Sequence, residues 1–114
     1  MRRFLNRRTA IAALGLASLA AISLVSAEAA EDSVLQIKQS FEPGEIEVAA
    51  GTTVTFLNGD DVNHNLQTIA PGGGKTDQGL EKPGEKTEIT FPTAGVYTVM
   101  CGIHPRMHMK VTAH

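Results

Sequence analysis

The sequence predicts a small all-β protein, a Greek-key β-sandwich, that follows a cleavable N-terminal signal peptide. Three observations support this prediction: a basic and then apolar start, short alternating segments after it, and Gly- and Pro-rich turns between those segments. The chain has 114 residues, which is enough for one small domain. Its single cysteine excludes an intramolecular disulfide and a Cys-x-x-Cys redox pair.

Residues 1–29 have the composition of a secretory signal peptide. Four arginines precede an apolar run over residues 10–25, and small residues follow it, with cleavage expected after Ala27 or Ala29. This run is shorter than the roughly 20 apolar residues that span a bilayer, which argues against the alternative of an uncleaved membrane anchor. Residues 7–8 resemble a twin-arginine export signal, and the ordinary secretion route stays open as the alternative.

The mature domain, residues 30–114, is acidic. It has six basic residues against eleven acidic residues, a net charge of −5 with histidine neutral. This charge favours a basic protein partner and disfavours an anionic membrane surface. The sequence has neither the basic patch nor the aromatic content typical of a nucleic-acid-binding protein. We expect a periplasmic monomer with no stable membrane insertion after the signal peptide is removed.

Five segments of the mature domain alternate between apolar and polar residues or are rich in β-branched residues. They are residues 34–38, 45–48, 52–56, 87–91 and 96–101. Short strands separated by turn residues at this spacing indicate an antiparallel sandwich or barrel. Between Asn58 and Lys86 we expect turns and a flexible loop, without regular structure over residues 72–84.

The last of these strands predicts where the cysteine points. Side chains alternate along a strand, so Tyr97, Val99 and Cys101 share one face. If Tyr97 faces the core, Cys101 ends an inward-facing row where the strand gives way to a loop. We expect Tyr97 itself to form a structural tyrosine corner, as in other β-sandwiches.

The segment that follows this strand contains three candidate metal ligands. Cys101, His104 and Met107 lie within seven residues, and so short a loop can bring their side chains around one point. His64 is the candidate for the fourth metal ligand. Taken singly, such residues are more often core or exposed side chains. Together, two imidazoles and a thiolate with a weak axial thioether form the ligand set that holds copper for electron transfer.

Three motifs between residues 41 and 104 resemble those of one family, the cupredoxins or blue copper proteins, and within it amicyanin and plastocyanin, and the resemblance extends over residues 34–112. The motifs are Phe41-x-Pro43-x-x-Ile46-x-Val48-x-x-Gly51-x-x-Val54-x-Phe56-x-Asn58, His64-Asn65, and Gly95-x-Tyr97-x-Val99-x-Cys101-x-x-His104. The resemblance implies a cupredoxin-like copper-binding domain over residues 30–114. It also implies that Asn65 ties the segment of the first histidine to the loop after the cysteine.

The resemblance further implies that His64, Cys101, His104 and a methionine bind one copper ion. Met107 gives the short loop spacing of amicyanin, and Met109 gives the longer spacing of plastocyanin. The residues from Met107 onward resemble the Met-x-x-Lys-Val of the family, where the chain re-enters a strand. We therefore expect Met107 to be the axial ligand, with Met109 as the alternative.

The function implied by the resemblance is one-electron transfer in the periplasm. The copper ion cycles between Cu(I) and Cu(II), and the partners are redox proteins such as a c-type cytochrome or a periplasmic dehydrogenase. In relatives the second histidine reaches the surface within an apolar patch, so we expect electrons to pass through His104, with Arg106 and Met109 lining that patch.

Two other functions compete with electron transfer. A copper storage, delivery or tolerance protein would use the same site, and soft side chains near the loop favour it: Met100, Met107, Met109, His108 and His114. An enzyme is not expected, because the sequence has no nucleophile–base arrangement and no second cluster of ligands beside the first.

Overall fold

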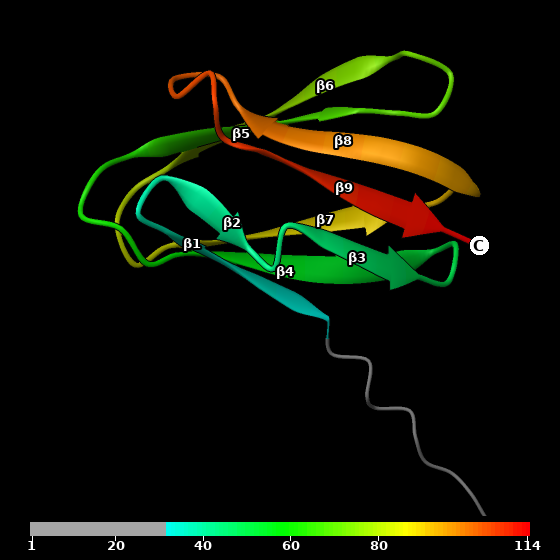
Figure 1. Cartoon of the computed structure of the whole chain (residues 1–114), viewed down its shortest axis with the longest axis horizontal. Helices are drawn as coiled ribbons and strands as arrows, with labels where there is room; N and C mark the ends of the chain where they lie inside the picture. Colours follow the sequence, from blue (N-terminus) through cyan, green and yellow to red (C-terminus); the bar gives the residue numbers. More distant parts are fainter. Residues whose placement is uncertain (1–31) are drawn as a thin grey trace, which may run out of the picture.

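The structure is a computed structural model that describes residues 32–114 (Figure 1). The predicted signal peptide, residues 1–29, lies outside the described residues. Within them no helix is long and apolar enough to cross a membrane. The described chain consists of strands β1 (Ser33–Ile37), β2 (Ser40–Glu42), β3 (Glu45–Val48), β4 (Thr52–Asn58), β5 (His64–Ile69), β6 (Lys75–Glu81), β7 (Lys86–Phe91), β8 (Gly95–Cys101) and β9 (His108–Ala113).

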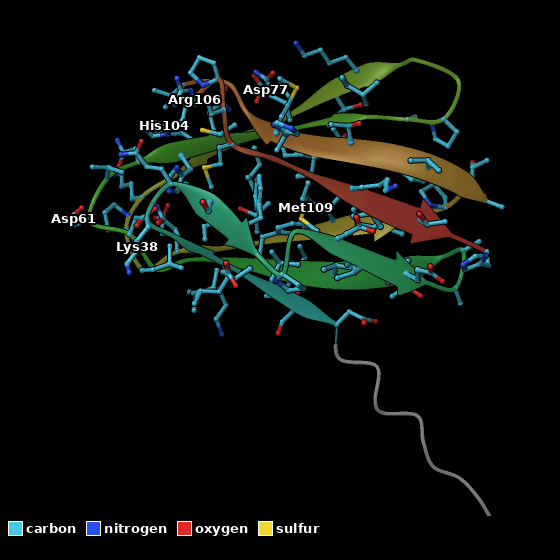
Figure 2. All side chains as sticks on the ribbon, viewed as in Figure 1. Lys38, Asp61, Asp77, His104, Arg106 and Met109 are labelled. Carbon is cyan, nitrogen blue, oxygen red and sulfur yellow. The ribbon has the colours of Figure 1, made fainter. Side chains whose placement is uncertain are left out.

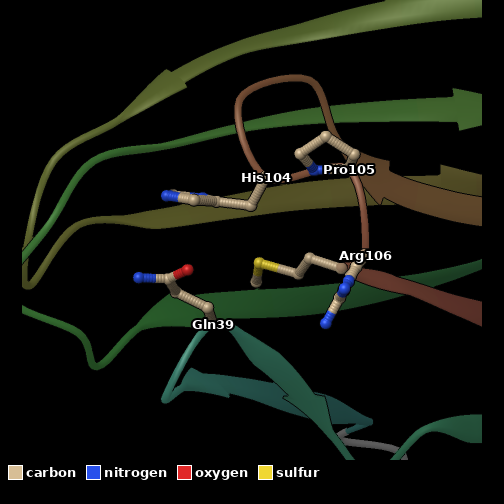
Figure 3. Close-up of a pocket in the computed structure, with 5 residues that line it drawn as sticks. Gln39, His104, Pro105 and Arg106 are labelled. Carbon is tan, nitrogen blue, oxygen red and sulfur yellow. The ribbon is translucent and has the colours of Figure 1, made fainter.

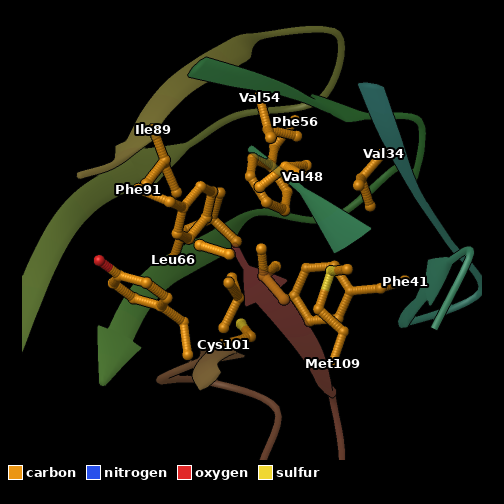
Figure 4. Packing of buried hydrophobic residues seen from close by; sticks show 14 of the residues in the cluster. Val34, Phe41, Val48, Val54, Phe56, Leu66, Ile89, Phe91, Cys101 and Met109 are labelled. Carbon is orange, nitrogen blue, oxygen red and sulfur yellow. The ribbon is translucent and has the colours of Figure 1, made fainter. Parts of the chain in front are cut away.

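The strands form two sheets that pack face to face (Figure 1). One sheet has the order β2-β1-β4-β7 and the other has the order β3-β9-β8-β5-β6. Buried apolar side chains from both sheets fill the space between them, and the rings of Phe91 and Tyr97 pack edge to face there (Figure 4). The all-β sandwich predicted from the sequence is confirmed, because alternating residues give each sheet one apolar face that must be covered.

The strand pairing differs from the expected antiparallel arrangement in two places. β1 pairs with β4 in parallel, and β3 pairs with β9 in parallel. The chain crosses from one sheet to the other on either side of β3. Since β4 returns to the first sheet after that crossing, it can lie beside β1 in the same direction without a tight hairpin.

The expectation of no regular structure over residues 72–84 is wrong, because β5 and β6 form a hairpin between Asn58 and Lys86. Polar residues on the inward face of β5, His64 and Thr68, hide its apolar alternation. β6 is an edge strand and is mostly exposed, so its pairing with β5 rests on backbone hydrogen bonds and leaves little hydrophobic pattern in the sequence.

A polar network joins the two sheets inside the sandwich. Glu81 of β6 is buried, and its carboxylate accepts hydrogen bonds from Gln36 Nε2 of β1 at 2.5 Å and from Thr87 Oγ1 of β7 at 2.6 Å. Its backbone oxygen accepts a bond from Asn58 Nδ2, which also donates to the backbone oxygen of Val62. This network therefore holds the β4–β5 loop in place just before His64.

The predicted inward row of β8 is confirmed. Tyr97, Val99 and Cys101 are all buried in the core. The predicted tyrosine corner is also present, since the Tyr97 hydroxyl donates to the backbone oxygen of Thr93 and accepts from its backbone nitrogen, at 3.0 and 2.9 Å. The corner fixes the turn that starts β8, the strand that ends at the cysteine.

We predict that Tyr97→Phe lowers the free energy of unfolding by about 1–2 kcal/mol, because two partly buried backbone groups of Thr93 lose their partner. Denaturant unfolding of the copper-free protein measures this loss. Thr53→Val is the control, since it removes an exposed hydroxyl pair with Thr90 and is expected to change stability by less than about 0.5 kcal/mol. Equal effects of the two substitutions would contradict the structural role of the corner.

Candidate metal centre

Four predicted metal-binding residues lie at one end of the sandwich, where β5 begins and β8 ends. His64 is the first residue of β5 and Cys101 is the last residue of β8, and these strands are antiparallel neighbours. His104 and Met107 belong to the loop between β8 and β9. His64, Cys101 and Met107 are buried, whereas His104 is half-buried.

The donor atoms of three of these residues converge. His64 Nδ1, Cys101 Sγ and His104 Nδ1 lie within 4.8 Å of one another. The two nitrogens are 3.2 Å apart, and the sulfur lies 3.8 Å from His64 Nδ1 and 3.4 Å from His104 Nδ1. Bonds of about 2.0–2.3 Å to one ion in a trigonal plane place such donors about 3.5–3.7 Å apart. The side chains therefore already have the spacing of a three-coordinate metal site.

The loop between β8 and β9 folds back on itself and returns Met107 to the cysteine. Met107 N donates to the backbone oxygen of His104 at 2.9 Å, and the backbone oxygen of Met107 accepts from Cys101 N at 3.1 Å. Met107 also lines a pocket of about 260 Å³ with His104, Pro105, Arg106 and Gln39 of the β1–β2 turn (Figure 3). The loop thus places the thioether of Met107 beside His104.

Met109 has a different environment. It lies on β9 opposite Val99, is buried in the core, and sits between the two sheets near Phe41 (Figures 2 and 4). The expectation that Met109 lines a surface patch is therefore wrong, because the inward face of β9 points into the sandwich. Arg106 does line the pocket beside His104, as expected.

Asn65 joins the segment of His64 to the loop after Cys101, as the resemblance implied, and it does so through its backbone. Its backbone oxygen accepts from Gly102 N at 2.8 Å, and its backbone nitrogen donates to Cys101 Sγ at 3.3 Å. The side chain points instead to β6, where Nδ2 donates to Asp77 and to the backbone of Gly79. The bond from Asn65 N also fixes the position of the sulfur beside the first strand of the cluster.

One residue of the site, Asp60, was not predicted from the sequence. Its Oδ2 lies 2.8 Å from His64 Nε2, on the side of the ring away from the cysteine. Partial burial raises the pKa of the Asp60 carboxyl, but bonds from the backbone of Gln39, from His64 and from the backbone of Lys38 outweigh it and hold the pKa below its usual value. The sequence does contain an acidic residue four positions before His64, but Asp60 lies in a segment whose composition is that of an ordinary turn.

The donor set selects among metals. A thiolate and a thioether are soft ligands that suit copper, and imidazole suits copper in both oxidation states, whereas a thioether is a poor ligand for zinc. The fold and the site together define a β-sandwich protein with a site suited to copper. The chain belongs to the copper binding proteins of the plastocyanin/azurin family, whose pattern matches residues 28–114, and copper is its cofactor.

Named relatives of the chain include amicyanins and plastocyanins. Amicyanin of Paracoccus denitrificans is 34% identical over 92 residues, which cover 75% of this chain and 69% of that protein. Amicyanin-alpha of Methylorubrum extorquens is 30% identical over 90% of this chain and 87% of that protein. Chloroplastic plastocyanin of Physcomitrium patens is 38% identical over 61% of this chain, a match that spans only 46% of the plastocyanin.

Solved structures that superpose on this chain are also cupredoxins. The reduced state of an amicyanin mutant superposes with a TM-score of 0.68 at 30% identity and covers 75% of this chain and 83% of that one. A purple cupredoxin from Nitrosopumilus maritimus superposes with a TM-score of 0.65 at 27% identity and covers 74% of this chain and all of that one. The resemblance to the cupredoxins stated from the sequence motifs is therefore confirmed.

We predict that Gly102→Ala destabilises the copper-free protein by about 1 kcal/mol, because the added Cβ displaces the Gln67 amide and breaks its hydrogen bond to Asn65 Oδ1. A Cβ at this position would lie 2.6 Å from Gln67 Nε2 and 2.7 Å from Asn65 Oδ1. Thermal unfolding measures the loss. Gly72→Ala is the matched control, since nothing lies within 4 Å of its Cβ, and the expected change is below about 0.5 kcal/mol. A neutral Gly102→Ala would show that this contact is not tight.

Proposed function

We propose that this protein is a periplasmic one-electron carrier with a single blue copper ion held by His64, Cys101, His104 and Met107. The observation that carries the proposal is the convergence of two imidazole nitrogens and a sulfur within 4.8 Å. Copper supplies a one-electron couple there, since the thiolate and thioether favour Cu(I) while the imidazoles keep Cu(II) bound. The names of its relatives, amicyanin and plastocyanin, support the same class of function.

Rigidity of the donor set is the physical requirement for fast electron transfer. Three of the four proposed ligands are buried, and backbone bonds join Asn65 to Gly102 and Met107 to Cys101. A packed, hydrogen-bonded site keeps its shape when the charge of the ion changes, so little rearrangement accompanies each transfer. The site thus needs no moving part and no open coordination position.

The half-buried His104 is the proposed exit for the electron. It lies at the end of the sandwich beside Arg106 (Figure 2) and is followed by Pro105 in the wall of the pocket. Ile103, directly before it, is 50% exposed. An exposed apolar rim allows close, short-lived docking, while the net charge of −5 over residues 30–114 attracts a basic partner. A c-type cytochrome or a periplasmic dehydrogenase fits this chemistry.

The burial of the donors favours a carrier over a copper-delivery protein. A delivery site must release its ion to an acceptor, and ligand exchange is fastest where the donors are exposed. Here His64 and Cys101 are buried on separate strands. Their side chains cannot leave the ion one at a time without disturbing the core.

We predict that copper-loaded protein shows the intense thiolate-to-copper absorption band of a blue site, and that Met107→Leu keeps this band but raises the reduction potential. Loss of a weak axial donor disfavours the more highly charged Cu(II) state. Redox titration measures the change. Met109→Leu is the matched control, because it makes the same substitution in the core and leaves the potential unchanged. A shift with Met109→Leu alone would assign the axial position to Met109, and absence of the band would reject the blue copper site.

We predict that electron exchange with a c-type cytochrome is complete before any copper moves to a Cu(I) chelator. Stopped-flow mixing measures the first process, and loss of the blue band in the presence of chelator measures the second. The electron-transfer rate is expected to fall as ionic strength rises, because the attraction is electrostatic. Cys101→Ser serves as the control without a blue site. Faster copper release than electron exchange would favour storage or delivery.

A further inference from the structure

Asp60 connects the proposed ligand His64 to a distant part of the chain. Its Oδ2 lies 2.8 Å from His64 Nε2 and accepts from Gln39 N at 2.9 Å, while its Oδ1 accepts from Lys38 N at 2.5 Å. Asp60 is itself oriented by a bond from its backbone nitrogen to Asn58 Oδ1 at 2.9 Å. One carboxylate therefore joins the β4–β5 loop, the β1–β2 turn and the imidazole.

The contact with Asp60 selects one tautomer of His64. An ionised carboxylate can only accept hydrogen bonds, so in the neutral ring Nε2 carries the proton and Nδ1 is left with a free lone pair. Nδ1 is the atom that faces the cluster, 3.8 Å from Cys101 Sγ. The ring is thus held with its lone pair toward the sulfur before any ion arrives.

The β1–β2 turn depends on the same carboxylate. Lys38 and Gln39 have φ values of 55° and 56°, and they form the two-residue link of a hairpin in which Ile37 pairs with Ser40. Such turns favour Asn-Gly, because residues with a Cβ are strained at positive φ. Here the two amides of the turn both donate to Asp60, which offsets that strain. The same turn carries Gln39 to the pocket that Met107 and His104 line.

We propose that Asp60 is a positioning residue of the copper centre: it holds His64 Nδ1 toward the metal and, through its negative charge, favours Cu(II) over Cu(I). The inference rests on the proposed function, in which His64 is a copper ligand. The side chain of Asp60 is only 9% exposed, so its charge is weakly screened by water. A fixed negative charge beside one imidazole stabilises the more positive oxidation state.

The test compares Asp60→Asn with Asp61→Asn in the full copper-loaded protein. Both substitutions remove one negative charge from adjacent positions, but Asp61 is exposed, and of the two aspartates it is Asp60 that contacts His64. For Asp60→Asn we expect the Cu(II)/Cu(I) ratio at a fixed applied potential to fall about tenfold, a rise of 59 mV in reduction potential for a one-electron couple. For Asp61→Asn we expect less than about a twofold change. Equal shifts, or none in Asp60→Asn, would overturn the proposal.

A second measurement needs no variant and no copper. Nitrogen-15 chemical shifts of the copper-free wild-type protein report which ring nitrogen of His64 carries the proton. At a pH where the ring is neutral we expect the Nε2-protonated tautomer alone, and a predominant Nδ1-protonated tautomer would overturn the proposal even if Asp60→Asn fails to fold. The absorption spectrum of the copper-loaded wild-type protein tests the proposed function separately, so the failure of one can be told from the failure of the other.

Discussion

The approach of β5 to the end of β8 is the constraint on which the rest of this protein depends. It brings two nitrogens and a sulfur within 4.8 Å in a largely buried position, where His64 and Cys101 lose contact with water. Such a cluster persists only if neighbouring groups orient the donors and bond their remaining polar atoms. The antiparallel pairing of Leu66 with Cys101 sets the separation, and the bond from Gly102 N to the Asn65 backbone fixes it.

Groups outside the cluster make the site rigid, and they come from both sheets. The β1–β2 turn reaches His64 through Asp60, and the Gln36–Glu81–Thr87 network holds the loop before it. The tyrosine corner at Thr93 anchors the start of β8, which delivers the cysteine at its other end. A one-electron carrier benefits from this construction because an ion in a fixed cage changes charge with little movement of its ligands.

Short-range patterns predicted part of the fold well. The alternation of residues 45–48 coincides with β3, and the row of Tyr97, Val99 and Cys101 faces the core as expected. The β5–β6 hairpin was missed because polar side chains on β5 serve the metal cluster and the edge strand β6 buries little. The two parallel pairings were missed because crossing between sheets is a property of the whole chain rather than of any segment.

The amino-acid sequence by itself determined the chemical nature of the site: one thiol, an imidazole three residues later and a thioether six residues later, in a loop too short to separate them. Local chain length limits where those groups can lie, so their proximity can be read from spacing alone. Only the tertiary structure decided how His64 joins them, which atom of its ring faces the sulfur, and that Asp60 holds the other. Those features depend on strands far apart in the chain, whose pairing is set by the packing of the two sheets against each other.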